Sequence, residues 1–272
     1  MIFQPEDRSI HDDIIRSFHN QGERTRPMGE LMLAVGNYFQ GFPYMSHMLE
    51  SEGRETLVIN LREFDCFTFV ENVVALAGLI SKSKSVFRGY AAQLKKIRYR
   101  SGMLSGYSSR LHYFSDWLYD NEKKGIVIDV TRRSGGEAFR KYFNFMTRHR
   151  DDYPVLRKEK SYREMIALEK RLSGRRLHYI PKAALGKFEH VVENGDLIAV
   201  TTDIEGLDVI HVGLAVRLKS RLHLLHASEI EKRVVVSNLT LHQYLSRRMM
   251  RTGIMIGRAI TACQNDGSPS SA

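Results

Sequence analysis

The chain has 272 residues, of which 43% are hydrophobic and 26% charged, which is enough for one large domain or two small ones with a buried core. An aromatic content of 10% argues against disorder, and two cysteines, Cys66 and Cys263, exclude a framework of disulfides. The net charge of +10 favours anionic partners, but the basic residues are scattered in pairs, so a solvated basic surface is a better interpretation than a nucleic-acid site.

The sequence has no segment typical of membrane insertion or secretion. Its longest apolar run, residues 73–80, is far too short to span a bilayer, so we predict no stable membrane insertion. The first residues lack the basic and apolar regions of a secretory signal, which leaves open a cytoplasmic protein or one whose leader has been removed. Residues 263–272 are polar and are expected to form a flexible tail, in which Cys263 has no predicted role.

The N-terminal region predicts two helices and a strand. Residues 9–20 and 24–39 have apolar residues at helical spacing. The sequence GFPY at residues 41–44 ends the second helix, because glycine and proline both stop helices. The sequence TLVINL at residues 56–61 is a short strand candidate.

Residues 63–80 predict a helix with a wide apolar face that begins at Cys66. Asp65 is a good N-cap, because its carboxylate can accept hydrogen bonds from the free N–H groups of the first turn. The helix dipole and the same N–H groups favour an anion, so we expect the Cys66 thiol to ionise more easily than usual. Cysteine is also a common core residue, and Cys66 lies between Phe64 and Phe67, so packing is the alternative.

The middle of the chain predicts mainly helices. Residues 86–122 are helical in pattern, with breaks near Gly102 and Gly106, and a short strand follows at residues 126–130. A further helical pattern extends from about residue 134 to residue 172 and is interrupted at Pro154.

The last third of the chain changes to strands. Short β-branched or apolar runs are bounded by turn residues, and the middle four are close enough together for an antiparallel meander. One late helix is predicted at residues 239–248. The outline is an α+β fold with helices first and a mainly antiparallel sheet afterwards. The predicted strands are residues 177–180, 195–202, 209–218, 222–227, 234–237 and 253–260.

Two of the eleven histidines occupy unusual positions. His211 lies inside the apolar strand VIHVGLAV, where a polar ring needs a partner or a function, and Gly213 on the same strand face allows close approach. His226 ends the next strand, so the two rings can be neighbours across a hairpin that turns around residues 219–221. One ring can then orient the other, although each can also be a hydrogen-bonded core histidine.

The sequence gives no strong indication of a metal or a cofactor. It contains neither HExxH nor paired CxxC motifs, and GxGxxG, P-loop and GxSxG motifs are absent as well. Cys66, His211 and His226 could in principle bind zinc, but structural zinc sites take four protein ligands. We therefore expect no metal and no cofactor.

Several motifs together resemble known cell-wall enzymes. Asp65 and Cys66 at the start of an apolar helix, followed by His211 and His226 in successive strands, resemble the NlpC-type papain-like cell-wall cysteine peptidases. The GFPY sequence is similar to the G-x-P-Y element of that family, whose tyrosine lies near the nucleophile. Longer segments resemble the N-acetylmuramoyl-L-alanine amidase-like family, once a domain of unknown function, from about residue 32 to residue 258. These segments are LREFDCFTFVENVVALA, SRLHYFSDWL, NGDLIAVTT, GLDVIHVGLAV and LLHAS.

The resemblance implies a papain-like α+β fold in which residues 1–262 form one domain. Residues 88–193 would be a large, mostly helical insertion that shapes the cleft. The resemblance also implies Cys66 as nucleophile, His211 as base and His226 as the orienting third residue.

The same resemblance implies a set of substrate-binding residues. Packing is the more usual role for the tryptophan of this set, and Arg258, late in the chain, is a further guess for the same region. The expected substrate-binding residues are Tyr44, Asp65, Arg110, Tyr113 and Trp117.

The expected reaction is hydrolysis of peptidoglycan fragments (muropeptides) at the amide between N-acetylmuramic acid and L-alanine, through a thioester. The same triad could instead cleave the γ-D-glutamyl bond to a diamino acid. A basic nucleic-acid-binding module and an inactive scaffold that only binds cell-wall fragments are also compatible with the sequence. The resemblance implies a location in the cell envelope or periplasm, and we expect a monomer that does not bind nucleic acid.

Overall fold

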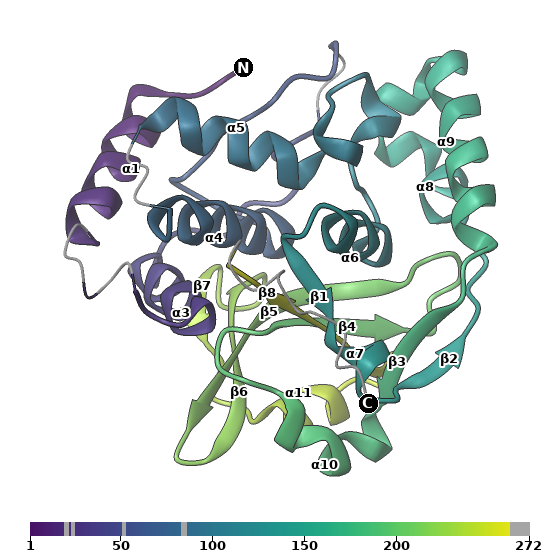
Figure 1. Cartoon of the computed structure of the whole chain (residues 1–272). Coiled ribbons are helices and arrows are strands. Elements are labelled where there is room, and N and C mark those ends of the chain that lie inside the picture. Colours follow the sequence, from purple (N-terminus) through teal and green to yellow (C-terminus); the bar gives the residue numbers. More distant parts are fainter. Residues whose placement is uncertain (19–21, 23–24, 51–52, 83–85, 262–272) are drawn as a thin grey trace, which may run out of the picture.

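Helices form one layer of the molecule and a twisted sheet forms the next (Figure 1). This computed structural model describes residues 1–18, 22, 25–50, 53–82 and 86–261. The α+β class and the antiparallel sheet predicted from the sequence are confirmed. The predicted tail at residues 263–272, with Cys263, lies outside the described residues.

Two N-terminal helices, α1 (Pro5–Ser17) and α3 (Met28–Tyr38), confirm the first two predicted helices. Helix α1 starts earlier than predicted because Pro5 occupies its first turn, where the missing N–H costs nothing. The strand predicted at residues 56–61 is wrong. That segment is extended, but its pairing is a single parallel bridge between Val58 and Ile2, because no neighbouring strand lies beside it among the described residues.

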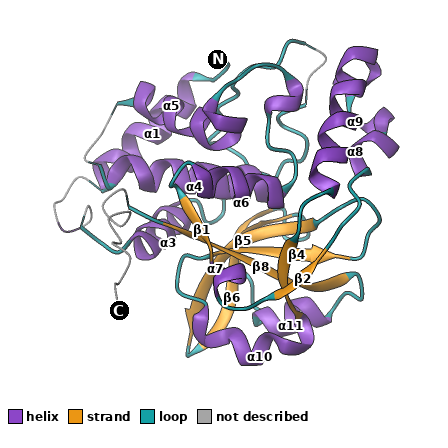
Figure 2. Cartoon of the chain, turned by 45° about the vertical axis from the view of Figure 1, so that its right-hand side comes forward, coloured by secondary structure: helices purple, strands orange, loops and turns teal. Residues whose placement is uncertain are grey.

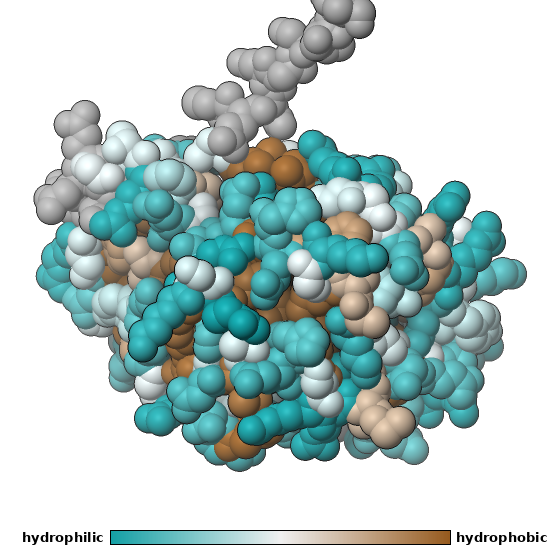
Figure 3. All heavy atoms as spheres, turned by 90° about the horizontal axis from the view of Figure 1, so that it is seen from below, coloured by the Kyte–Doolittle hydropathy of each residue, from teal (hydrophilic) through white to brown (hydrophobic). Residues whose placement is uncertain are grey.

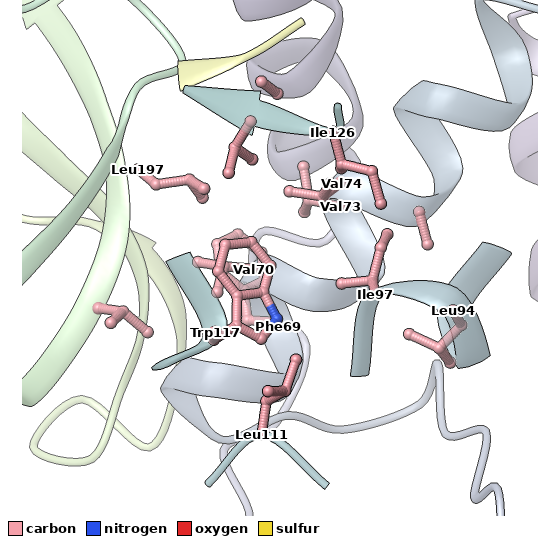
Figure 4. Close-up of a cluster of buried hydrophobic side chains, with 14 of the residues drawn as sticks. Phe69, Val70, Val73, Val74, Leu94, Ile97, Leu111, Trp117, Ile126 and Leu197 are labelled. Atoms are coloured by element: carbon pink, nitrogen blue, oxygen red, sulfur yellow. The ribbon is translucent and has the colours of Figure 1, made fainter. Parts of the chain in front are cut away.

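Helix α4 (Cys66–Ile80) is the central element of the helical layer (Figure 1). Its predicted N-cap is confirmed. The Asp65 carboxylate accepts from the Thr68 N–H at 2.7 Å, and the Thr68 hydroxyl accepts from the Asp65 N–H at 3.0 Å. The apolar face packs on α5 (Phe87–Arg98) and on the sheet, and Figure 4 shows Val70, Val73 and Val74 of α4 in this core.

The middle of the chain is helical as predicted at first and more irregular afterwards. Gly102 and Gly106 adopt left-handed φ angles of 72° and 117°, which confirms the breaks predicted there. The continuous helical pattern predicted over residues 134–172 is wrong in its first half, because a short strand pairs with the edge of the sheet. The elements are α6 (Phe114–Lys123), β1 (Val127–Asp129), α7 (Val130–Arg133), β2 (Glu137–Phe139), α8 (Phe145–Arg148) and α9 (Glu159–Ser173).

The sheet contains the predicted meander. Its described strands run in the order β2-β3-β8-β4-β5-β6-β7, β1 also pairs with β8, and every neighbouring pair is antiparallel. The last strand in the sequence is inserted beside β4, so the first strand of the meander is not an edge of the sheet. The strands are β3 (Leu177–Pro181), β4 (Leu197–Thr202), β5 (Val209–Leu218), β6 (Arg221–Ser228), β7 (Arg233–Val236) and β8 (Arg251–Ala259).

The two faces of the sheet have separate cores. Val212 and Leu214 of β5 pack toward the helical layer, whereas Ala215 belongs to a second cluster with Leu241 and Leu245. The latter two lie on α11 (Leu241–Ser246), which with α10 (Leu185–Phe188) covers the other face of the sheet (Figure 2). Seen from that side, the surface is dominated by hydrophilic side chains (Figure 3).

Within the part of the chain that the structure describes, no helix combines the length and the apolar character that crossing a membrane requires.

Candidate active site

The candidate site begins with Cys66 at the first turn of α4, where the residue is half-buried. The backbone N–H groups of Val212, Cys66 and Phe67 favour the thiolate, as the sequence predicted for a helix start. Burial and the neighbouring Asp65 carboxylate outweigh them and raise the pKa of the Cys66 thiol to about 12. The expectation of an easily ionised thiol is therefore wrong, chiefly because burial disfavours the thiolate and also because the residue that caps the helix repels a second negative charge.

His211 and His226 are brought together across the β5–β6 hairpin, as predicted. Nε2 of His211 and Nδ1 of His226 are joined by a hydrogen bond of 2.6 Å, and the two rings are nearly perpendicular at 89°. The hairpin turns tightly through Lys219 and Ser220, whose φ angles of 47° and 68° are those of a two-residue type I′ turn.

Gly213 allows this close approach of the two histidines. A Cβ atom at position 213 would lie 2.9 Å from the Cβ of His226 and 3.0 Å from the carbonyl oxygen of Leu225. The first distance is too short for a real side chain and the second is tight, so glycine at this position allows His226 to approach β5 closely.

Both imidazoles are neutral in this environment. Burial and the neighbouring His226 and Arg251 lower the pKa of His211 well below its usual value. Burial and Arg251 lower the pKa of His226 to about 4. If His211 carries its proton on Nε2 and donates it to His226, its Nδ1 is unprotonated and can accept a proton.

The thiol and the histidine pair lie at the same end of α4. The Cys66 sulfur is close to the N–H of Val212, the residue that follows His211 on β5. Among the described residues, however, neither imidazole is hydrogen-bonded to the thiol. Such contacts commonly tighten when substrate binds, so the arrangement is compatible with a nucleophile and its base.

A cavity of about 390 Å³ opens beside Cys66. Its walls come from α4, from the loop that follows α3 and from the helical segment after α5. Four of the predicted substrate-binding residues line it: Tyr44, Asp65, Arg110 and Tyr113. The lining residues that the sequence analysis missed are Ser46, His47, Leu49, Glu50, Phe67, Glu71, Arg98, Leu111, His112, Phe145, Met146, Tyr153, Leu207 and Ile210.

Tyr44 stands at the edge of this cavity, in a single parallel bridge with Phe64. The Lys232 ammonium lies 5.9 Å from the centre of its ring. Burial, followed by the charges of Cys66, Glu229 and Asp65, raises the pKa of Tyr44 well above its usual value, so its hydroxyl remains a neutral hydrogen-bond donor.

Arg110 and Tyr113 line the cavity with their polar groups already engaged. The Arg110 guanidinium pairs with Glu50 at 2.6 Å and Glu55 at 3.5 Å, and the Tyr113 hydroxyl donates to Glu169 at 2.6 Å. Arg110 therefore has its predicted place at the cavity wall, but its charge is neutralised by two carboxylates from a distant part of the sequence.

Trp117 does not line the cavity. It is 0% exposed, stacks on Phe114 with ring centres 5.7 Å apart, and lies in the core between the helices and the sheet (Figure 4). Its predicted contact with substrate is corrected to packing. Arg258 is not at the cavity either, because its guanidinium is held by Asp196 and Glu193 at 2.8 and 2.5 Å.

The most notable residues that sequence reasoning missed are Glu71 and Arg98. They form an ion pair of 2.6 Å at the wall of the cavity, with exposures of 0% and 2%. One signal was available, because Glu71 is a lone carboxylate in the otherwise apolar face of α4, and a buried charge requires a partner.

No group of three or more His, Cys, Asp or Glu side chains that could hold a metal ion occurs within residues 1–18, 22, 25–50, 53–82 and 86–261. The site itself offers a thiol, two neutral imidazoles and backbone N–H groups. A nucleophilic side chain with a base oriented by a third group is the arrangement of enzymes that transfer acyl groups.

This fold is that of an amidase-type enzyme. The chain belongs to the N-acetylmuramoyl-L-alanine amidase-like (AmiA-like) family, whose sequence profile matches residues 34–254. A search among curated proteins found no match.

Solved structures similar to this chain support the family assignment. An N-acetylmuramoyl-L-alanine amidase from Bacteroides uniformis is 38% identical, with a TM-score of 0.82, over 86% of this chain and 99% of that one. A putative xylanase from Bacteroides fragilis is also 38% identical, with a TM-score of 0.78, over 83% and 99% of the two chains. A Legionella pneumophila protein shares the fold at 22% identity, with a TM-score of 0.69, over 93% and 95%.

Proposed function

We propose that this protein hydrolyses muropeptides at the amide between N-acetylmuramic acid and L-alanine, through a thioester on Cys66. The observation that carries the proposal is the 2.6 Å hydrogen bond between His211 and His226 beside a cysteine at a helix start. The family and the Bacteroides uniformis amidase support the choice of bond.

The first half of the reaction forms the thioester. Nδ1 of His211 accepts the thiol proton as the Cys66 sulfur attacks the carbonyl carbon. Because the thiol has a pKa of about 12 and the imidazole is neutral, proton transfer accompanies the attack. The backbone N–H groups at the start of α4 donate to the oxyanion. Collapse of the tetrahedral intermediate breaks the C–N bond, and His211 gives its proton to the leaving amine.

The second half of the reaction regenerates the enzyme. His211 removes a proton from water, and the resulting hydroxide equivalent attacks the thioester carbonyl. The C–S bond then breaks, the sulfur regains the proton from His211, and the lactyl group of the sugar is released as a carboxylic acid that ionises in water. Nδ1 of His226 accepts the hydrogen bond from Nε2 of His211 throughout, which fixes the orientation of the base.

The carboxylates of the cavity favour amide hydrolysis over glycoside hydrolysis, the activity implied by the description of the Bacteroides fragilis relative. Glycosidases need two carboxyl groups free to act on either side of a bond. Here Asp65 caps α4, Glu50 pairs with Arg110 and Glu71 pairs with Arg98.

We also propose a papain-like, NlpC-type fold in which residues 1–262 are a single domain and residues 88–193 are the insertion that shapes the cavity. The insertion contributes Arg98, Arg110 and Tyr153 to the cavity wall, which supports this division. A monomer in the cell envelope or periplasm is the state in which we expect the enzyme to act, because its proposed substrates come from the cell wall.

The test is a muropeptide digest analysed by mass spectrometry. Wild-type protein should release free muramic sugar and an intact stem peptide, whereas Cys66→Ala and His211→Ala should release neither while remaining folded. His190→Ala, at an exposed histidine, is the matched control and should retain activity. Activity in Cys66→Ala would exclude the covalent route, and a dipeptide left on the sugar would indicate the γ-D-glutamyl endopeptidase instead.

A further inference from the structure

A third ring packs against the two imidazoles. Tyr244 of α11 lies with its ring centre 5.9 Å from that of His211 and 5.7 Å from that of His226. It therefore contacts both members of the pair from the face of the sheet that α11 covers. The helix that carries it is fixed by Thr240, whose hydroxyl accepts from the N–H of Gln243 at 3.3 Å.

Arg251, the first residue of β8, holds Tyr244 in turn. Its guanidinium carbon lies 3.8 Å from the centre of the tyrosine ring, and its Nη1 donates to the Tyr244 carbonyl. A cation this close to an aromatic face is strongly attracted to it. The guanidinium thus bonds to the residue both through the ring and through the backbone.

This arginine differs from Arg98, Arg110 and Arg258 in having no counter-ion among the described residues. Arg98, Arg110 and Arg258 each pair with a carboxylate, whereas no carboxylate of the described residues pairs with Arg251. Its Nε is buried and has no hydrogen-bond partner there either. An uncompensated positive charge therefore stands behind the tyrosine and the histidine pair.

The positive charge of Arg251 acts on both imidazoles. The titratable groups that act on the ring cluster are Cys66 from α4, Tyr244 from α11, Arg251 from β8, and the two histidines themselves from β5 and β6. Glu231, Arg233 and Arg247 line the same cavity as His226 and Tyr244, but none of them shifts the pKa of either histidine. Burial and then Arg251 lower the pKa of both histidines, and no carboxylate raises it. Arg248 acts on Tyr244 and Arg251 but is not among the causes that shift either histidine.

We infer that Arg251, through the ring of Tyr244, is a positioning residue that holds the histidine pair fixed and uncharged until the thiol proton arrives. The inference rests on the proposed function. Its chemical consequence is twofold: the base stays unprotonated in acid, and the imidazolium, once formed, is a stronger acid toward the leaving amine. The resting site is then a thiol beside neutral rings, not a preformed thiolate and imidazolium.

A titration of the histidine rings by nuclear magnetic resonance tests the inference without any substrate. In Arg251→Gln the pKa of His226 should rise from about 4 toward the ordinary value of 6.5. Arg248→Gln, which removes a neighbouring exposed arginine, should leave it unchanged. Arg251→Lys keeps the positive charge but lacks the planar group that stacks on Tyr244, and its His226 pKa should stay near the wild-type value. A His226 pKa that is equal in Arg251→Gln and Arg248→Gln overturns the inference.

A kinetic measurement adds a second readout. The acid limb of the kcat/KM profile should move to higher pH in Arg251→Gln, so that activity at pH 5 relative to pH 8 falls about tenfold for each unit by which the pKa of the base rises into that range. An unchanged acid limb contradicts the inference. Failure of the proposed function would instead appear as a wild-type protein that does not cleave muropeptides, with the histidine titration still interpretable.

Discussion

Position 213 favours glycine, because the strand there lies against the Cβ of His226, whose ring orients the base. In Gly213→Ala the new methyl would lie 2.9 Å from His226, so β5 and β6 must separate and the histidine hydrogen bond must lengthen. We expect a loss of about 1–3 kcal/mol in the free energy of unfolding and at least a tenfold fall in kcat/KM. Chemical denaturation and muropeptide assays measure the two effects.

Gly186→Ala is the matched control for this substitution. Nothing lies within 4 Å of a Cβ atom at position 186, in α10, so stability and activity should both be retained. Equal behaviour of the two variants would show that the close approach at position 213 has no consequence for the site.

The thiol of Cys66 should react slowly at neutral pH. Because its pKa is about 12, the thiolate fraction rises about tenfold per pH unit up to that value, and alkylation by iodoacetamide should rise in parallel. The measurement uses Cys263→Ala protein, in which Cys66 is the single thiol. Asp65→Asn, which keeps a capping side chain and removes the charge, should be alkylated faster. A rate that levels off near pH 7 would contradict this prediction.

At the scale of residues, the sequence predicted the features that local patterns determine. The cap at Asp65 and the meeting of His211 with His226 follow from helix and hairpin periodicity, and both are found. The raised pKa of Cys66 and the engagement of Arg110 depend on burial and on carboxylates brought together by folding. Such partners, about sixty positions away for Arg110, leave no local signal.

At the scale of elements, the buried pair Glu71–Arg98 ties α4 to α5. Removing Glu71 leaves a buried guanidinium without a counter-ion, which typically costs about 3–5 kcal/mol. Glu71→Ala should therefore lower the free energy of unfolding by that amount in urea denaturation. Arg163→Ala removes an exposed pair with Glu159 within α9 and should cost less than about 1 kcal/mol. A similar small cost for both variants would contradict the structural role of the buried pair.

Long periodic elements were predictable and short ones were not. Helix α4 and strands β4 to β6 carry strong patterns, and the structure confirms them. Strand β2 has three residues and is specified by its neighbour β3, so its own sequence looks helical. Residues 56–61 show the opposite error: among the described residues, this strand-like sequence pairs through a single bridge.

At the scale of the whole molecule, the excess positive charge of +10 lies largely outside the candidate site. The two arginines of the cavity are neutralised by carboxylates, and rings such as Tyr44, Phe145 and Tyr153 make up much of its wall. For the proposed function, we expect the cavity to take the neutral, sugar-bearing part of a muropeptide and the basic surface to attract its acidic stem from a distance. The composition predicted an attraction for anionic partners but gave no information about where the neutral cavity and the basic surface lie.

The burial of Trp117 provides the protein with an internal optical probe. It is the single tryptophan of the chain, fully shielded from water, and its ring lies 6.3 Å from that of Phe67, which lines the cavity next to Cys66. Its fluorescence should be blue-shifted in the folded enzyme and should respond when a compound displaces Phe67. Ligand affinity can therefore be followed by emission alone, in catalytically silent variants and without a label.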